Sequence, residues 1–220
     1  MRAELARLHE RLSTTTVYVT HDQIEAMTLG QRVAIMRDGR IQQVDGPQAL
    51  YARPANLFVA AFIGSPSMNL VEASIDDDSV AFARFRIPLD RDRRPVDGDG
   101  DGRLILGIRP ESFEDAAFAE PGLPQIDVEV EVLEELGSDA HVIFRVDAPR
   151  VETEELRAAS DEEDESLLAD EQISHFNARV DPWTKARVGN RITLAVDPST
   201  FHFFDRGTGQ SLTGSATAVV

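Results

Sequence analysis

The sequence of 220 residues contains no cysteine and only one lysine, Lys185, beside 21 arginines. Without cysteine, disulfide bonds and zinc or redox sites built on thiolates are excluded. Chemistry that requires a lysine at a set place must use Lys185 or be absent. Long hydrophobic runs are missing too. The longest run, Leu57–Ile63, has seven residues, whereas a membrane-spanning helix needs about 20, so we expect no membrane insertion by this chain.

Basic residues are also scarce: 22 of them face 39 acidic residues, for a formal net charge of −17. A strongly acidic protein repels nucleic acid and anionic lipid at long range, so neither is an expected partner. Residues 151–172 hold ten acidic residues and one arginine, which predicts a solvated acidic insertion at about 148–172. The hydrophobic fraction of 42% is enough for a folded core. The cytoplasm is the simplest compartment for such a chain.

Residues 1–64 predict a mixture of helices and strands. Leucines at positions 5, 8 and 12 repeat at helical spacing, and residues 14–20 (TTTVYVT) are β-branched and aromatic, which is typical of a strand. Asp22 can cap a following helix, with Glu25 completing a capping box, and Gly30 can end that helix in a left-handed conformation.

Further signals complete this first part. Asp38-Gly39 predicts a tight hairpin turn, Gly46-Pro47 starts a helix through Ala52, and Asn56–Ile63 predicts another helix that stops at Gly64. We therefore expect an α/β fragment over residues 1–64 and a domain boundary near Gly64.

Short strands dominate from Met68 onward, which predicts a small barrel or sandwich over residues 65–220. The expected strands are Leu70–Ile75, Val80–Ile87, Leu104–Ile108, Ile126–Leu136, His141–Val146, Phe176–Val180, Ile192–Val196 and Phe201–Phe204.

His21 is the candidate functional residue because it stands where a strand is expected to end and a helix to begin. An imidazole there can donate to a phosphate oxygen or orient a water, or it can be a half-exposed residue at a capped helix start. Residues 97–102 (DGDGDG) resemble a calcium loop, but Ile108 stands where the bidentate glutamate belongs, so we expect a solvated turn. Phe201–Phe204 is expected in the core, because nothing nearby is basic enough for a nucleic-acid platform.

Several strings in order resemble the ATPase subunits of ABC sugar importers of the maltose, trehalose and glycerol-phosphate type. They are Thr15–Leu29, Arg32–Met36, Asp38–Ile41, Tyr51–Ala60, Phe62–Asn69, Gly107–Glu111 and Leu136–Ser138. The resemblance implies a C-terminal piece of an ABC ATPase domain over residues 1–64, followed by an all-β OB-like regulatory domain over 65–220.

The same resemblance implies roles and partners. His21 would be the switch histidine that contacts the γ-phosphate of ATP, and the family uses ATP with Mg. The implied partners are membrane permease subunits, a second ATPase subunit in a homodimer, and an inhibitory regulatory protein on residues 65–220. The implied location is the cytoplasmic face of the plasma membrane.

The departures from the family pattern matter equally. The printed sequence has no Gly-Lys pair of a phosphate loop, no Leu-Ser-Gly-Gly-Gln signature and no apolar strand ending in Asp-Glu. It looks like the C-terminal part of such an ATPase, begun at an internal methionine. We expect it to be inactive alone and to self-associate through the faces of residues 1–64 that a split sheet exposes. The alternative is a stand-alone, non-catalytic OB-like regulatory or ligand-sensing module.

Overall fold

The computed structural model describes residues 14–95, 102–153 and 173–212, together with the single residues Glu4, Arg7, Arg11 and Leu156. The expected helix over residues 1–12 and most of the DGDGDG and acidic segments lie outside this part. The helices are α2 (Gln23–Leu29), α3 (Pro47–Ala52), α4 (Leu57–Phe62) and the short 3-10 turns η1 (Arg91–Arg93), η2 (Pro110–Ser112) and η4 (Pro198–Thr200). None of the helices in the described ranges is long and apolar enough to cross a membrane.

Twelve strands complete the described elements. They are β1 (Val33–Arg37), β2 (Arg40–Asp45), β3 (Asn69–Asp76), β4 (Ser79–Phe82), β5 (Phe85–Pro88), β6 (Arg103–Ile108), β7 (Phe113–Asp115), β8 (Gln125–Glu135), β9 (Ala140–Val146), β10 (Ser174–Val180), β11 (Arg191–Val196) and β12 (His202–Phe204).

Helix α2 begins as expected but ends differently. The Asp22 carboxylate accepts hydrogen bonds from the backbone N–H groups of Ile24 and Glu25. Glu25 does not complete a capping box, because its carboxylate accepts from the hydroxyls of Tyr18 and Thr20 instead. The left-handed end predicted at Gly30 is wrong: Gly30 is extended, with φ −78°. A glycine fits there because a Cβ would lie 2.8 Å from the Ala26 carbonyl oxygen.

The strand predicted over residues 14–20 is also wrong. This segment is irregular, and Val17 and Val19 are 86% and 90% exposed. β-Branched residues favour a strand only where a neighbouring strand supplies hydrogen bonds and packing. Within the described residues no strand pairs with this segment, so its propensity is not realised.

The hairpin and the two following helices match the prediction. Asp38 and Gly39 both have positive φ values, 49° and 74°, which join β1 and β2 in a tight turn. Pro47 starts α3, and the Asn56 side chain accepts from the Val59 N–H to cap α4. A small core holds these elements together; its buried members are Val33, Ile35, Leu50, Phe58, Val59 and Ile63.

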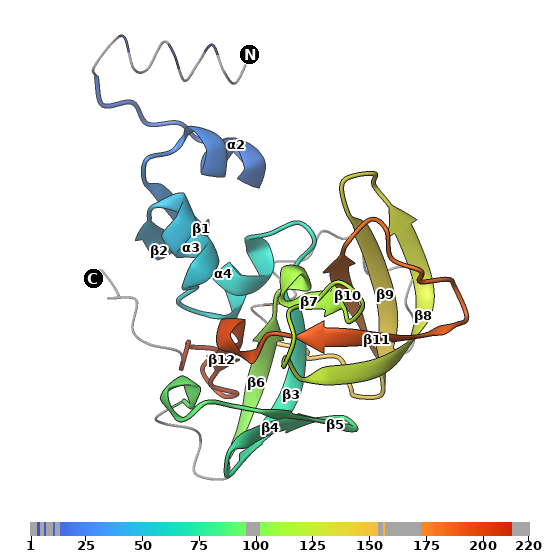
Figure 1. Cartoon of the computed structure of the whole chain (residues 1–220). Coiled ribbons are helices and arrows are strands. Elements are labelled where there is room, and N and C mark those ends of the chain that lie inside the picture. Colours follow the sequence, from blue (N-terminus) through green and yellow to red (C-terminus); the bar gives the residue numbers. More distant parts are fainter. Residues whose placement is uncertain are drawn as a thin grey trace.

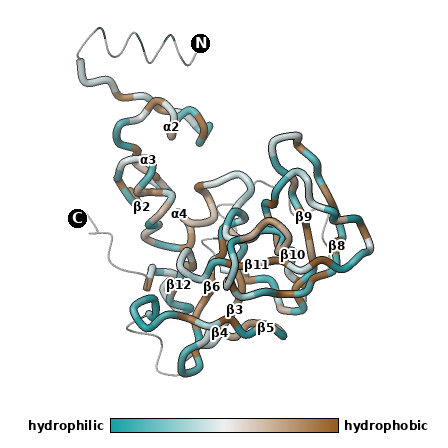
Figure 2. Tube along the Cα trace, viewed as in Figure 1, coloured by the Kyte–Doolittle hydropathy of each residue, from teal (hydrophilic) through white to brown (hydrophobic). Residues whose placement is uncertain are grey.

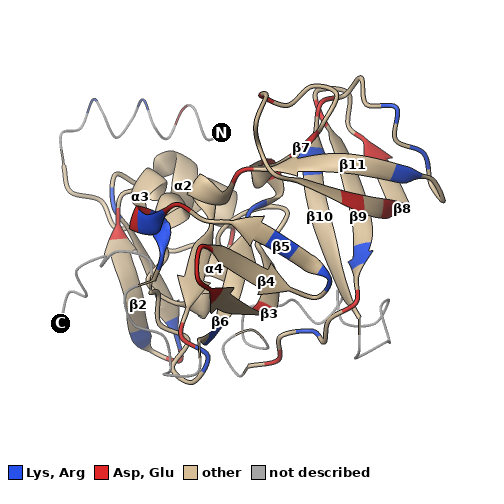
Figure 3. Ribbon diagram, turned by 60° about the horizontal axis from the view of Figure 1, so that its bottom comes forward, with Lys and Arg blue, Asp and Glu red and all other residues tan. Residues whose placement is uncertain are grey.

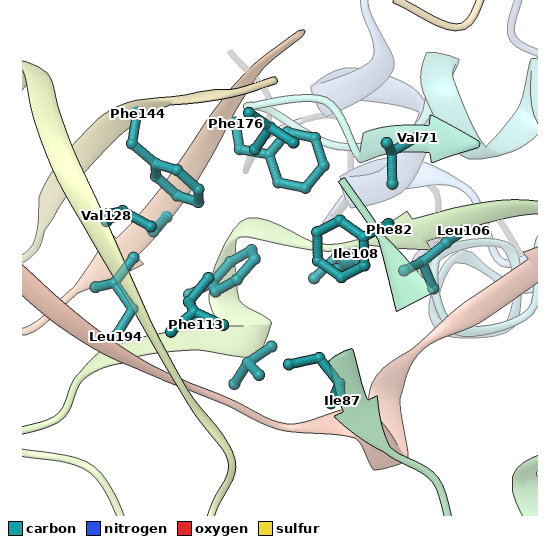
Figure 4. Close-up of a cluster of buried hydrophobic side chains, with 14 of the residues drawn as sticks. Val71, Phe82, Ile87, Leu106, Ile108, Phe113, Val128, Phe144, Phe176 and Leu194 are labelled. Atoms are coloured by element: carbon teal, nitrogen blue, oxygen red, sulfur yellow. The ribbon is translucent and has the colours of Figure 1, made fainter. Parts of the chain in front are cut away.

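The rest of the described chain forms two five-stranded antiparallel sheets, ordered β12-β6-β3-β4-β5 and β10-β9-β8-β11-β7 (Figure 1). Both contribute to one hydrophobic core, with Val71 and Leu106 from the first sheet and Phe144 and Phe176 from the second (Figure 4). Figure 2 shows hydrophobic stretches along the strands that supply this core, among them β3, β6 and β9. The described residues after Gly64 are mostly in strands, as expected.

Two details of the strand prediction need correction. The single strand expected over Val80–Ile87 is a hairpin, because Ala83, with φ 45°, turns the chain between β4 and β5. Strand β7 was not anticipated; it is only three residues long and pairs with β11. The expected burial of Phe201–Phe204 is confirmed, since Phe201, Phe203 and Phe204 are fully buried.

Asn69, the first residue of β3, joins the two sheets. Its side-chain amide donates to the carbonyls of Ile108 in β6 and Asn177 in β10, both at 2.9 Å. Its Oδ1 accepts from the Asn177 N–H at 2.7 Å. One buried side chain, 6% exposed, therefore satisfies backbone groups of both sheets.

Candidate functional site

His21 directly precedes Asp22, the N-cap of α2, and α2 lies away from the two large sheets (Figure 1). Its side chain is exposed, and the neighbouring Asp22, not His21, caps the helix. Thr20 orders the segment because its Oγ1 accepts from the Asp22 N–H at 3.0 Å and donates to Glu25 at 3.0 Å. His21 is therefore presented to solvent from a locally braced turn.

The next residue of interest, Gln23, ties the His21 segment to the end of α4. Its Oε1 accepts from the backbone N–H of Gly64 at 3.0 Å, across 41 positions of sequence. That N–H would otherwise continue α4 by bonding the Ala60 carbonyl. The bond thus both ends α4 and fixes the start of α2.

Arg109, the arginine that follows β6, collects the carbonyls that α3 and α4 leave unpaired at their C-termini. Its Nη1 donates to the carbonyls of Ile63 and Ala60, and its Nη2 donates to the carbonyl of Tyr51 at 3.0 Å. A cation at helix C-termini also interacts favourably with the helix dipoles. Arg109 is only 3% exposed, so the guanidinium group is enclosed by the junction that it stabilises.

Tyr51 completes this junction. The Arg109 guanidinium lies 4.0 Å from the centre of the Tyr51 ring, and the Tyr51 hydroxyl donates to the Glu111 carboxylate. Burial, followed by the hydrogen bond to Glu111, raises the pKa of Tyr51 to about 12. Burial lowers the pKa of Arg109, while Tyr51 and Glu111 act in the opposite direction.

His202 is the buried histidine beside the same junction. Desolvation, then the charges of Arg109 and Arg93, lower its pKa to about 4. It is 8% exposed and lies over Phe204, with the ring centroids 6.4 Å apart. At neutral pH His202 is therefore uncharged, which suits its place next to two arginines.

Apolar packing reinforces these polar contacts. Leu57 and Ala60 of α4 lie in one buried cluster with Met68, Ile105 and Phe204. Backbone hydrogen bonds add to it: Leu57 N–H donates to the Gly209 carbonyl, and Ser211 N–H donates to the Ala55 carbonyl. Helix α4 is thus packed on the first sheet, directly across the expected boundary at Gly64.

Within the described ranges no three His, Asp or Glu side chains are grouped so that they could hold a metal ion. Lys185 is exposed in the loop between β10 and β11 and belongs to a different part of the chain from His21. His21 is the residue that the sequence analysis proposed as a donor to a phosphate oxygen.

Charged residues elsewhere on the large sheets are extensively paired. Figure 3 shows acidic and basic positions interspersed over β8 to β11. The His175 imidazole lies 2.9 Å from Glu131, and the Arg179 guanidinium lies 3.0 Å from Asp139. Both pairs are partly exposed to solvent, and exposed ion pairs contribute little to stability individually.

Sequence reasoning missed Gln23, Gly64 and Arg109 as members of one cluster. All three lie inside strings that resemble the importer family, Thr15–Leu29, Phe62–Asn69 and Gly107–Glu111, but nothing local in those strings indicated that they are in contact. The available signal was an arginine that directly follows an apolar stretch, Leu104–Ile108, and precedes a proline.

Comparison with known proteins agrees with the architecture. Residues 64–113 match the family described as the MalK OB fold domain. The chain is 40% identical over 219 residues to the trehalose import ATP-binding protein SugC of Mycobacterium tuberculosis, covering 97% of this chain and 55% of SugC. It is 39% identical to the diacetylchitobiose uptake system ATP-binding protein MsiK of Streptomyces coelicolor, covering 96% of this chain and 54% of MsiK. The trehalose/maltose import ATP-binding protein MalK of Thermococcus litoralis is 38% identical, covering 96% and 52%. The chain spans about half the length of the curated relatives it matches.

Proposed function

Because this chain is a homologue of the C-terminal part of the ATP-binding subunits of ABC sugar importers, we propose that it is the C-terminal portion of such a subunit. In this role it couples ATP hydrolysis to the uptake of a sugar or related solute. Residues 1–64 belong to the ATPase domain, and residues 65–220 form an OB-like regulatory domain with an acidic insertion at about 148–172.

The observation that carries this proposal is relatedness over nearly the whole chain, at 40% identity to SugC. The arrangement of the junction supports it. A small α/β unit bearing His21 packs on an all-β unit through Arg109, Tyr51 and α4. Such a connection is what a regulatory domain needs in order to act on an ATPase domain.

In this proposal His21 is the switch histidine and contacts the γ-phosphate of ATP within the longer subunit. An exposed imidazole on a braced turn is free to meet a ligand held by other parts of the protein. The proposed partners are permease subunits, a second ATPase subunit in a homodimer, and an inhibitory protein on the regulatory domain. The proposed location is the cytoplasmic face of the membrane.

A chimera tests the proposal. The region of SugC that matches this chain is replaced by residues 1–220, and trehalose uptake is measured in a mycobacterial strain that lacks SugC. We expect the chimera to restore uptake, because the relatedness extends across the whole replaced region. A folded, expressed chimera that gives no uptake would contradict the proposal.

The second candidate is a stand-alone non-catalytic binding module, for which the match of residues 64–113 to an OB fold domain family is the supporting observation. It predicts that a small ligand raises the melting temperature of the purified chain. It shares with the first candidate the expectation that the chain alone neither binds ATP tightly nor hydrolyses it. ATP turnover that co-purifies with the chain and disappears in His21→Ala would overturn that expectation for both.

A further inference from the structure

The peptide unit between Ile63 and Gly64 is hydrogen-bonded at both its carbonyl and its N–H. Its carbonyl accepts a hydrogen bond from Arg109, which belongs to the large β unit. Its N–H donates to Gln23, two residues after His21. Because a peptide unit is planar and rigid, a displacement of the carbonyl displaces the N–H as well.

We propose that the Ile63–Gly64 peptide unit couples the β unit to the His21 segment, with Arg109 and Gln23 as its positioning residues. The inference rests on the proposed function, because it assigns a regulatory purpose to the position of His21. It adds a specific route by which a change in the β unit reaches the histidine.

The Arg109 end of this connection is firmly held. The side chain leaves the chain directly after β6, a strand paired on both sides by β3 and β12. Its guanidinium is enclosed, and it donates to three carbonyls in two helices. A planar, forked donor with several fixed acceptors has little freedom to reorient. The Ile63 carbonyl is therefore held relative to the sheet.

Among the described residues, the Gln23 end is less buried than the Arg109 end. Helix α2 has seven residues and no buried side chain, and its Ala26 and Met27 pack partly against the small core. An element with so little burial opens easily. The hydrogen bond that its first residue, Gln23, accepts from the Gly64 N–H is therefore a large share of what positions it.

Gly64 is required between the two ends. Its φ of +124° is a conformation that side chains disfavour, and a Cβ would lie 2.7 Å from Arg109 Nη1. Any other residue would move either the peptide unit or the guanidinium. The glycine thus permits the close approach on which the coupling depends.

Amide hydrogen exchange of the full chain, without nucleotide, tests the proposal. Arg109→Lys keeps the positive charge but loses the two-pronged guanidinium donor, and Arg109 itself has no hydrogen bond to α2. We expect this variant to speed amide exchange at Gly64 and within α2 by roughly two- to tenfold. That is the change in the population of the locally open state that one net hydrogen bond represents. Unchanged exchange in β9 verifies that the core is intact.

The matched control is Arg206→Lys, which weakens a forked contact with Glu72 on the surface of the β unit. It should leave α2 at the parental rate. Gln23→Ala should reproduce the Arg109→Lys pattern at Gly64 and α2, and Gln23→Glu, which retains the acceptor oxygen, should restore protection. The glutamate rescue separates positioning from a general loss of packing.

The proposal is overturned if Arg109→Lys speeds exchange only around η2 and α4 while α2 keeps its parental rate. If Arg109→Lys also lowers protection in β9, the Gly64→Ala variant is measured instead. Amide exchange in α2 of Gly64→Ala at the parental rate would then refute the coupling. A negative result here leaves the importer proposal standing. An inactive SugC chimera refutes the importer proposal without affecting the exchange result.

Discussion

Replacement of Asn69 by alanine is the sharpest test of how the two large sheets are joined. The variant removes three hydrogen bonds, to the Ile108 carbonyl and to both backbone groups of Asn177. Each such bond contributes a net 0.5–1.5 kcal/mol, so Asn69→Ala should lower the free energy of unfolding by about 2–4 kcal/mol. The Ile108 carbonyl is buried and cannot recover its bond with bulk water, whereas Asn177 is half-buried and can recover part of its own, so we expect the middle of that range.

Asn177→Ala is the matched control. The same two residues meet, but the Asn177 side chain contributes an Oδ1 that is buried without a partner in the described structure. Its removal leaves the backbone contacts with Asn69 in place, so we expect a change below about 1 kcal/mol. Comparing the two variants therefore separates the effect of the three Asn69 hydrogen bonds from the effect of losing any asparagine side chain at this contact.

Urea unfolding at neutral pH, followed by far-ultraviolet circular dichroism, measures both variants. Trp183, the single tryptophan, is 80% exposed and would report the core poorly by fluorescence. An unchanged denaturant slope is needed for the comparison to be valid. If Asn69→Ala lowers the free energy of unfolding no more than Asn177→Ala does, the Asn69 hydrogen bonds do not join the two sheets as we have argued.

Three further predictions concern the junction and the surface. Gly107→Ala should destabilise the protein by about 1–3 kcal/mol, because its Cβ would overlap the Met68 sulfur and lie 3.1 Å from the Phe204 ring; Met68→Ala in the same chain should recover part of that loss in urea titrations, and full additivity would contradict this. Burial holds the pKa of His202 at about 4 instead of 6.5, so the unfolded state binds the extra proton as the pH falls between these values. His202→Gln should therefore lose about 2 kcal/mol less stability than the parent between pH 7.5 and 4.5 in parallel unfolding titrations, and equal losses would refute this. The exposed Val17 and Val19 should promote self-association in light scattering, whereas a monomer at high concentration would count against it.

Elements with local signals were predictable from the sequence. Asp38-Gly39 specifies its hairpin because both residues tolerate positive φ, and Asn56 and Pro47 mark helix starts through their own chemistry. The long strands were predictable because apolar and polar residues alternate along them. In β8, for example, the apolar residues Ile126, Val128 and Val130 face the core.

Features that depend on distant partners were not predictable in this way. Residues 14–20 have the composition of a strand but no neighbour among the described residues to pair with. Gly30 is needed for close approach to the Ala26 carbonyl and not for a left-handed turn. The cluster of Gln23, Gly64 and Arg109 joins residues more than 40 positions apart, and no local periodicity encodes such contacts. The sequence thus indicated His21 but not what positions it.

The most direct test of the central claim is the ATPase rate of the purified SugC chimera with its permease, compared for His21→Ala and Gln31→Ala. Gln31 is exposed just beyond the other end of α2 and serves as the matched control. Loss of a transition-state donor costs about 100- to 1000-fold in rate, so we predict a loss of this size for His21→Ala and a rate near the parent for Gln31→Ala. Equal rates for the two variants would contradict the assignment of His21 and, with it, the proposed role of the segment that Gln23 and Arg109 position.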